Sequence, residues 1–95
     1  MQNERRHYVY VLKSAKNQKR YIGSTKLEPR LRLRQHNSGS NTWTRQNGPF
    51  YLIYTEDYQS KTEAIKRERF LKSGVGRKFL DENLIGEVSS ASAEG

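Results

Sequence analysis

Hydrophobic and polar residues alternate in two short segments near the N-terminus. The first segment, HYVYVLKS at residues 7–14, is rich in Tyr and Val, and its alternation is typical of a β-strand. On such a strand Tyr10 points to one face, and Val9 and Val11 point to the other. A polar turn, AKNQ, separates it from KRYIGS at residues 19–24, so the pattern predicts a β-hairpin.

A helical pattern and a further strand follow the hairpin. Residues 27–37, LEPRLRLRQHN, are predicted to form a helix with Pro29 in its first turn, where a missing N–H group costs nothing. Residues 37–41, NSGSN, then predict a flexible loop. After a turn, NGP, a run of aromatic and branched residues at 50–56 indicates a third strand.

A second helix is predicted in the C-terminal third, followed by weaker signals. Ser60 and Glu63 have the spacing of a capping box, which predicts a helix over residues 60–73. Glycines interrupt the pattern after this helix, and residues 77–85 predict only a short final helical turn. Residues 86–95 are small, polar and acidic, and we expect them to form a disordered tail.

Composition limits the chain to one domain and to a few classes of protein. Its 95 residues leave room for a single core, so we expect an N-terminal extension (1–7), one folded domain (8–85) and the acidic tail (86–95). The absence of cysteine excludes a disulfide framework and a thiolate metal site. No apolar run is long enough to span a bilayer and no signal-peptide pattern occurs, which favours a cytoplasmic protein.

Charge is distributed unevenly along the chain, whose formal net charge is +8. Residues 8–80 carry 16 Lys and Arg against 5 Asp and Glu, a net of +11, whereas residues 81–95 carry four acidic residues and no basic one. A body this basic favours a polyanionic partner, most often nucleic acid; the simpler alternative is a solvated basic surface. Membrane binding is disfavoured because no basic helix carries a broad apolar face.

Helical spacing singles out candidate site residues. Arg32 and His36 are four residues apart, so both lie on one face of the first predicted helix. Glu68 shares a stripe with Ala64 and Leu71, which the second predicted helix is expected to pack inward. A carboxylate on such a stripe is costly unless it is paired or binds a cation, so Glu68 is either a salt-bridge partner or a metal ligand.

Five motifs occur in order along the chain: YVYVL, YIGST, RLRQHNSG, GPFYLIY and EAIKRERFLK, which begin at Tyr8, Tyr21, Arg32, Gly48 and Glu63. This ordered set resembles the GIY-YIG nuclease superfamily, and within it the small single-domain bacterial proteins. The resemblance implies an α+β fold, with a small three-stranded antiparallel sheet flanked by helices in the order β-β-α-β-α and a weak last helix. It also implies hydrolysis of DNA phosphodiester bonds with a divalent metal, Mg²⁺ or Mn²⁺.

By position, the resemblance assigns catalytic roles to Tyr10, Tyr21, Arg32, His36 and Glu68. Glu68 matches the single metal-binding glutamate of the family, and Arg32 matches its helix arginine. Arg30 is a rival for the arginine role because the gap after Tyr21 is one residue longer than usual, although only Arg32 keeps the four-residue spacing to His36.

The chemistry of these side chains agrees with the roles. Mg²⁺ prefers oxygen ligands and often takes only one or two carboxylates, so Glu68 could hold it against a phosphate to which Arg32 donates hydrogen bonds. A tyrosine with a pKa near ~10 is a poor base at neutral pH. We therefore expect a metal and arginines to lower the pKa of Tyr10, which would act as the general base or position the attacking water. Tyr21 and His36 would orient water and phosphate.

Further residues are expected to contact nucleic acid. Gly23 either turns the chain at the end of its strand or lets another element or a phosphate approach closely. Trp43, in the predicted loop region, either stacks on a base or packs at the domain edge. Ser24 and Thr25 either bind phosphate oxygens or satisfy backbone groups at the loop, and the second is favoured. The basic side chains expected to contact backbone phosphates are Arg30, Arg34, Lys72, Arg77 and Lys78.

Three functions are compatible with these features. The leading one is a metal-dependent DNA endonuclease that recognises DNA structure or backbone rather than a long sequence. The main alternative is a nucleic-acid-binding module that does not cleave, or a subunit that cleaves only with a protein partner, because exposed tyrosines among Lys and Arg also suit single strands. The third is a protein-interaction domain whose acidic tail shields the basic face until a partner displaces it.

Overall fold

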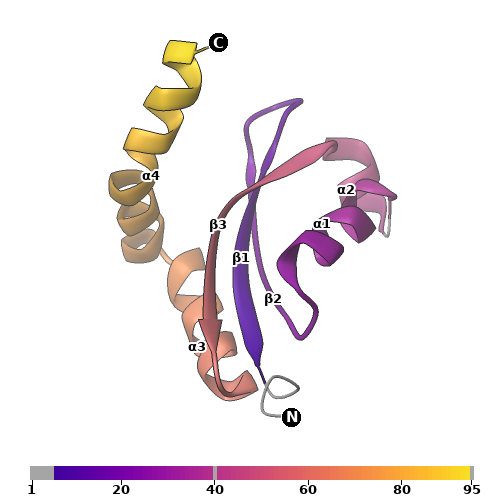
Figure 1. The fold of residues 1–95 in the computed structure, drawn as a ribbon, viewed down its shortest axis with the longest axis vertical. Coiled ribbons are helices and arrows are strands. Elements are labelled where there is room, and N and C mark those ends of the chain that lie inside the picture. Colours follow the sequence, from indigo (N-terminus) through magenta and orange to yellow (C-terminus); the bar gives the residue numbers. More distant parts are fainter. Residues whose placement is uncertain (1–5, 40, 95) are drawn as a thin grey trace.

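A three-stranded antiparallel sheet forms the centre of the protein (Figure 1). The structure, a computed structural model, describes residues 6–39 and 41–94, and the side chains of 85–94 lie outside what it describes. The sheet has the order β2-β1-β3 and consists of β1 (His7–Ser14), β2 (Arg20–Thr25) and β3 (Phe50–Tyr58). The α+β fold with a three-stranded antiparallel sheet is therefore confirmed.

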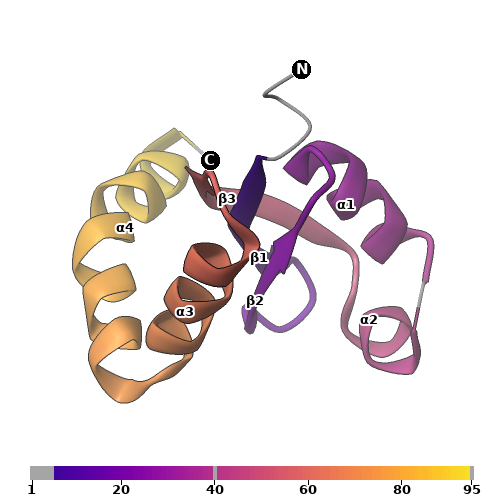
Figure 2. The same ribbon diagram turned by 90° about the horizontal axis from the view of Figure 1, so that it is seen from below.

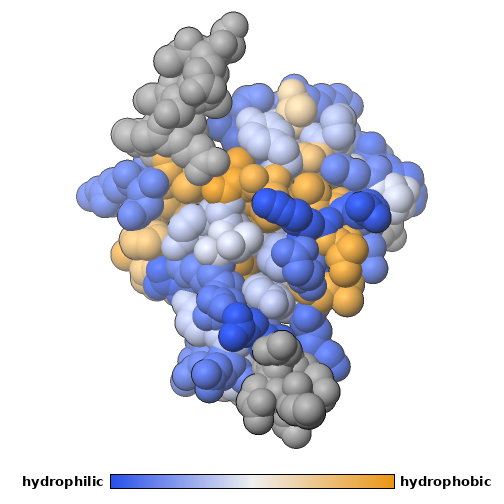
Figure 3. Space-filling model, in the orientation of Figure 1, coloured by the Kyte–Doolittle hydropathy of each residue, from blue (hydrophilic) through white to orange (hydrophobic). Residues whose placement is uncertain are grey.

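Helices cover both faces of this sheet (Figure 2). One face carries α1 (Pro29–Asn37) and α2 (Thr42–Asn47), and the other carries α3 (Lys61–Lys72) and α4 (Gly74–Glu94). Figure 3 shows one side of the molecule, on which hydrophilic side chains predominate and hydrophobic ones gather in a central band. None of the helices in the described part of the chain is long and apolar enough to cross a membrane.

The alternation along β1 directs its side chains to two faces, as predicted, and each face carries its own hydrophobic cluster rather than the single core expected from chain length. Val9 and Val11 are fully buried against α3 and α4, together with Ala64, Leu71, Leu80 and Leu84. Tyr10 and Leu12 point to the opposite face and pack with Phe50 beneath α1 and α2. Burying each such side chain contributes roughly 1.5–3 kcal/mol, so the central strand anchors both helical layers.

The pairing of β1 with β2 determines which side chains share the face beneath α1. Tyr10 pairs with Gly23 and Leu12 pairs with Tyr21, so Tyr21 and Gly23 lie on the same face as Tyr10. Ile22 and Ser24 point to the other face, toward α3. Since β2 is an edge strand, the side chains along it border an open side of the sheet.

Helix α2 replaces the loop that the sequence predicts around Trp43. Its N-terminus is closed by a reciprocal capping box, in which the Thr44 N–H donates to Asn41 Oδ1 (2.9 Å) and the Asn41 N–H donates to Thr44 Oγ1 (3.2 Å). A helix of six residues is too short to show a hydrophobic period, so the spacing of Asn41 and Thr44 is its only strong sequence signal.

The α3–α4 region confirms one prediction and corrects another. Helix α3 begins after Ser60, whose hydroxyl accepts the Glu63 N–H at 3.1 Å, as the capping-box spacing predicts. Helix α4 runs from Gly74 to Glu94, whereas the sequence predicts only a short turn and then a disordered tail over 86–95. Ala and Glu are good helix formers, so this small, polar composition does not oppose a helical backbone. The proposed shielding of a basic face by the tail's acidic side chains stays a prediction.

The predicted N-terminal extension, residues 1–7, lies mostly outside the described residues. His7 already belongs to β1, and Arg6 Nη1 donates to Asp57 Oδ2 at 2.8 Å. Both side chains of this pair are about half exposed, so the contact joins the start of the described chain to β3 without adding much stability.

Candidate active site

A buried hydrogen bond joins Tyr10 of β1 to His36 of α1. Tyr10 Oη lies 3.0 Å from His36 Nε2, and the two residues are 1% and 0% exposed. His36 Nδ1 has no hydrogen-bond partner among the described residues. With the ring proton on Nδ1, the Tyr10 hydroxyl donates to Nε2; with the ring proton on Nε2, the ring donates to Tyr10 Oη instead.

Burial determines the ionisation of this pair. Burial raises the pKa of Tyr10 to about 12, even though the neighbouring Arg32 acts to lower it. Burial, and then the charge of Arg32, lowers the pKa of His36. Both side chains are therefore neutral near pH 7. Arg32 acts in the predicted direction, but without a metal burial outweighs it, so the joint effect of a metal and arginines on the pKa of Tyr10 stays a prediction.

Gly23 leaves room for the Tyr10 ring. A Cβ atom at Gly23 would lie 2.5 Å from Tyr10 Oη and 2.7 Å from its Cζ, both closer than van der Waals contact allows. Gly23 lies within β2, which continues to Thr25, so it does not turn the chain as one alternative predicts. The close approach of another element is the alternative that the structure confirms, and contact with a phosphate stays a prediction.

Aromatic rings extend from this pair toward the surface. The ring of Tyr21 lies 4.7 Å from that of His36 and 5.4 Å from that of Trp43, and it stacks on Tyr10 at 6.2 Å. Trp43 stacks in turn on Phe50 at 5.6 Å. Trp43 thus packs on the domain, as the simpler alternative predicts, while 37% of it stays exposed.

Glu68 lies on the α3 side of β2 and has two partners. Ser24 Oγ donates to Glu68 Oε1 at 2.7 Å, and Lys72 Nζ donates to Glu68 Oε2 at 2.7 Å. The salt-bridge alternative for Glu68 is therefore present in the free protein. The expected role of Ser24 is wrong because its hydroxyl binds a carboxylate, whereas Thr25 does accept a backbone N–H, that of Leu27, as expected.

The arginines of α1 lie on two sides of the helix. Arg32 is half-buried and close enough to Tyr10 and His36 to shift both pKa values. Arg30 and Arg34 are exposed and line a separate hollow of about 490 Å³ between α1 and Leu52 of β3. Arg32, rather than its rival Arg30, therefore accompanies the tyrosine–histidine pair.

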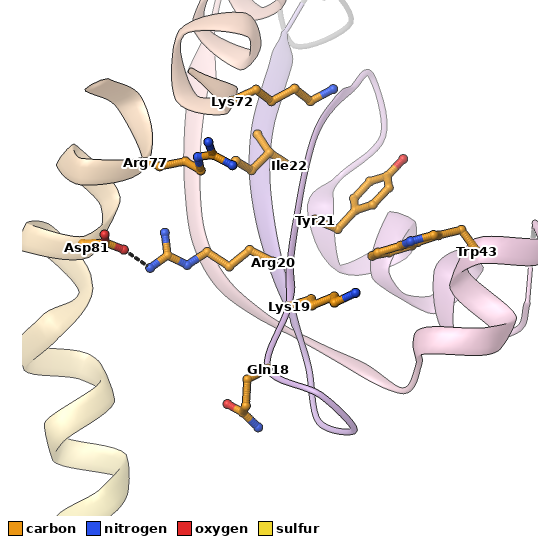
Figure 4. Close-up of a pocket in the computed structure, with 9 residues that line it drawn as sticks. All are labelled: Gln18, Lys19, Arg20, Tyr21, Ile22, Trp43, Lys72, Arg77 and Asp81. Atoms are coloured by element: carbon orange, nitrogen blue, oxygen red, sulfur yellow. Dashed lines mark hydrogen bonds and ion pairs between the residues drawn. The ribbon is translucent and has the colours of Figure 1, made fainter. Parts of the chain in front are cut away.

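An open groove of about 750 Å³ follows the free edge of β2 (Figure 4). Three of the residues expected to contact nucleic acid, Trp43, Lys72 and Arg77, line this groove. Lys78 is exposed on α4 and does not line it. The full lining consists of Gln18, Lys19, Arg20, Tyr21, Ile22, Trp43, Lys72, Arg77 and Asp81. Four cations and one carboxylate give the groove a positive charge.

Comparison with known proteins identifies the domain. A family model described as the GIY-YIG catalytic domain matches residues 6–79, most of the chain. The chain belongs to the GIY-YIG family. The GIY-YIG domain is a nuclease domain, which implies a nucleic-acid substrate.

Similar proteins of this GIY-YIG family carry names that state no activity. The UPF0213 protein of Staphylococcus aureus (strain Mu3 / ATCC 700698) is 35% identical over 75 residues, which cover 78% of this chain and 89% of that protein. UPF0213 protein SAV0488 of Staphylococcus aureus (strain Mu50 / ATCC 700699) matches with the same identity and coverage. The solution NMR structure of the UPF0213 protein BH0048 from Bacillus halodurans is 34% identical, covers 81% of this chain and 83% of that chain, and has a TM-score of 0.49.

Glu68 is the carboxylate of this GIY-YIG site that a hard cation could use. No group of three or more His, Cys, Asp or Glu side chains there could share a metal ion. Glu68 and Ser24 offer a carboxylate and a hydroxyl, and the Lys72 ammonium already stands where a cation would sit. An all-oxygen donor set with one carboxylate suits a cation that keeps several of its waters, as Mg²⁺ does.

Sequence reasoning missed the lower part of the GIY-YIG groove. Gln18, Lys19 and Arg20 line it, and Arg20 forms an ion pair with Asp81 of α4 across it. Lys19 and Arg20 directly precede Tyr21, so their position next to the YIGST motif could have identified them as groove residues. What the sequence could not provide was the strand order that puts β2 at the edge.

Proposed function

We propose that this GIY-YIG domain is a divalent-metal-dependent endonuclease that hydrolyses DNA phosphodiester bonds. The observation that carries the proposal is the Glu68 carboxylate, which Ser24 fixes beside the strand that bears Tyr21 and Gly23. Mg²⁺ or Mn²⁺ on this carboxylate would offset the charge that develops on the scissile phosphate and polarise its oxygens. Recognition would depend on DNA structure and backbone, because the domain offers few elements that could read bases.

The neighbouring side chains would position the substrate. Arg32 would donate hydrogen bonds from its planar guanidinium to the phosphate. His36 would fix the orientation of the Tyr10 hydroxyl through the hydrogen bond between Nε2 and Oη. With a pKa of about 12, Tyr10 would act as a neutral hydroxyl that positions the attacking water rather than as a phenolate base. Tyr21 would orient the same water or phosphate from the adjacent strand.

Positioning alone is a sufficient role for Tyr10. Phosphoryl transfer passes through a loose transition state, so catalysis depends mainly on placing the reactants and stabilising charge. In such a transition state the attacking water does not need a strong base early in the reaction. A neutral tyrosine is a poor base at pH 7, but the positioning role does not require it to act as one.

The test is an incubation of the purified chain with duplex, flapped and single-stranded DNA, with Mg²⁺, with Mn²⁺ and with a chelator. The proposal predicts cleavage of at least one DNA form with either metal and none with the chelator. Cleavage that persists in the chelator would contradict metal dependence. Cleavage of RNA but not of DNA would correct the substrate.

A binding module that does not cleave is the second candidate. The observation that favours it is the Lys72 ammonium, which already neutralises Glu68 in the free protein. Salt-sensitive DNA binding without cleavage under any metal condition, unchanged in Glu68→Gln, would support this function instead.

A further inference from the structure

Glu68 has one partner on a strand and one partner on a long, exposed side chain. Ser24 has a short side chain on a strand, so its hydroxyl can reach Glu68 Oε1 from few positions. Lys72 is the last residue of α3, and its side chain is 53% exposed while that of Glu68 is only 20% exposed. The ammonium therefore occupies the solvent-facing side of the carboxylate, where another cation would also enter.

Lys72 lines the groove and also forms the ion pair with Glu68. It lines the groove at the edge of β2, and Figure 4 shows its side chain extending from α3 toward that strand, with Arg77 along the same wall. A lysine side chain has a flexible four-carbon stem that carries a compact charge. The ammonium can thus exchange Glu68 for a phosphate in the groove by rotating its own bonds, without any backbone movement.

A divalent cation and the Lys72 ammonium cannot share Glu68. Both would approach the carboxylate from the Oε2 side, because Oε1 faces the Ser24 hydroxyl. Two like charges placed a few ångströms apart also repel, more strongly at a half-buried site than in water. Binding of the metal must therefore release Lys72.

We propose that Lys72 is a displaceable counter-ion of Glu68, an inference that rests on the proposed function. Without metal, Lys72 neutralises and orients the carboxylate. When Mg²⁺ or Mn²⁺ binds, Lys72 moves into the groove and binds a phosphate of the nucleic-acid strand. Metal and nucleic acid then strengthen each other's binding, and by linkage the effect is equal in both directions.

The test is the affinity of the free protein for Mn²⁺, measured by the electron paramagnetic resonance of unbound Mn²⁺ without nucleic acid. Lys72→Met removes the competing ammonium and should tighten Mn²⁺ binding by roughly three- to tenfold. The metal then no longer has to break a partly exposed ion pair or to overcome repulsion from the ammonium. Lys66→Met is the matched control, because Lys66 is exposed on the same helix and the charge change is the same. Lys72→Arg, which keeps the cation, should bind Mn²⁺ about as weakly as the wild type.

Three outcomes are distinguishable once circular dichroism shows that the variants are folded. Tighter binding in Lys72→Met only, abolished by adding Glu68→Gln, supports the inference. Equal Mn²⁺ affinity in Lys72→Met and Lys66→Met, with binding that still requires Glu68, overturns the counter-ion role and leaves the proposed function standing. The absence of any Glu68-dependent Mn²⁺ binding overturns both.

A second measurement tests the movement of Lys72 to phosphate. The salt dependence of oligonucleotide binding reports how many cationic side chains contact phosphates. With Mn²⁺, the slope of log K against log salt should fall by about one in Lys72→Met. Without metal the slope should match that of the wild type, because Lys72 is then bound to Glu68. The same loss under both conditions would overturn the movement.

Discussion

At the scale of single residues, the contact between Tyr10 and His36 carries the most information about mechanism. Their hydrogen bond is fully buried, and burial shifts the pKa values of both toward the neutral forms. A buried neutral pair can hold a hydroxyl in a fixed direction at little cost. The phenolate form of Tyr10 is disfavoured, because its buried surroundings do not solvate the charge.

The activity of Tyr10→Phe tests this role. Loss of the positioned hydroxyl should lower the cleavage rate by roughly 10²-fold, the cost of removing one well-placed hydrogen-bonding group. Because the Tyr10 hydroxyl would act without losing its proton, the wild-type rate should not follow the phenolate fraction, which with a pKa of about 12 rises about tenfold per pH unit between pH 7 and 9. A tenfold rise per pH unit in the wild type, absent from Tyr10→Phe, would show instead that the phenolate is the base.

Gly23→Ala tests the close packing of the site. The added Cβ would meet Tyr10 Oη at 2.5 Å, so the ring must move and the buried hydrogen bond to His36 is disturbed. We expect a loss of about 1–3 kcal/mol in the free energy of unfolding, the usual cost of overpacking, measured by urea denaturation. Gly74→Ala is the control, because nothing lies within 4 Å of its added Cβ. Equal effects of the two substitutions would contradict the packing argument.

At the scale of elements, one charged cluster fastens β3 to α3. Arg67 donates to both carboxylate oxygens of Glu56, at 3.0 and 3.1 Å, and its guanidinium lies over the rings of Phe70 and Phe79. The hydroxyls of Tyr54 and Tyr58, on the same face of β3, also donate to Glu56. Burial alone would raise the pKa of Glu56, but these donors outweigh it and lower the pKa.

This cluster predicts a loss of stability in acid. Because the pKa of Glu56 is lower in the folded chain than in the unfolded one, its contribution is fully present above the unfolded value of 4.5 and is lost as pH falls through the folded value. Glu56→Gln should cost about 1–3 kcal/mol at pH 7 and flatten the fall in stability below pH 4.5. Urea denaturation between pH 3 and 7 measures both effects. If the free energy of unfolding falls as steeply below pH 4.5 in the variant as in the wild type, other carboxylates cause the fall.

The sequence predicted elements where the signal is local. Alternation around Val9 and Tyr10 gave the two faces of β1, and Ser60 gave the start of α3. Helix α2 was missed because six residues carry no period, and α4 because its glycines and small residues suggested a break. Gly76 in fact lets the first turn of α4 approach α3, since a Cβ there would lie 1.9 Å from the Phe70 carbonyl oxygen.

The candidate site was predictable in part for the same reason. The four-residue spacing of Arg32 and His36 is local, and both lie at Tyr10. The contact of Ser24 with Glu68 spans 44 residues, so neither the hydroxyl partner nor the groove at the edge of β2 could be read from the sequence. Both depend on a strand order that only long-range pairing sets.

At the scale of the whole molecule, part of the positive charge of the chain is gathered in one groove. Cations converge on the groove beside β2, where Tyr21 and Trp43 form one wall and Lys72 and Arg77 line the α3–α4 side. Such a groove suits a nucleic-acid backbone, and the partly exposed ring of Trp43 lies beside the groove. Affinity should therefore depend on where a lysine or arginine lies, and not only on the total charge.

Two neighbouring residues of α4 test this localisation. Arg77→Ala should weaken oligonucleotide binding several-fold and lower the salt slope by about one, because one phosphate contact is lost. Lys78→Ala removes the same charge from an exposed position that does not line the groove, and it should change binding little. Fluorescence anisotropy over a range of salt concentrations measures both. Equal effects would mean that the basic surface acts as a diffuse whole.

Glu68 is the residue on which the proposed metal-dependent cleavage depends most, and one comparison tests its role. The measurement is the single-turnover rate of DNA cleavage in Mg²⁺ or Mn²⁺ by the wild type, by Glu68→Gln and by Glu63→Gln, which neutralises an exposed carboxylate on the same helix. We predict that Glu68→Gln lowers the rate by about 100-fold or more, because the one carboxylate proposed to hold the metal is lost, while Glu63→Gln cleaves like the wild type. Equal rates for Glu68→Gln and Glu63→Gln would contradict the proposal that Glu68 holds the catalytic metal.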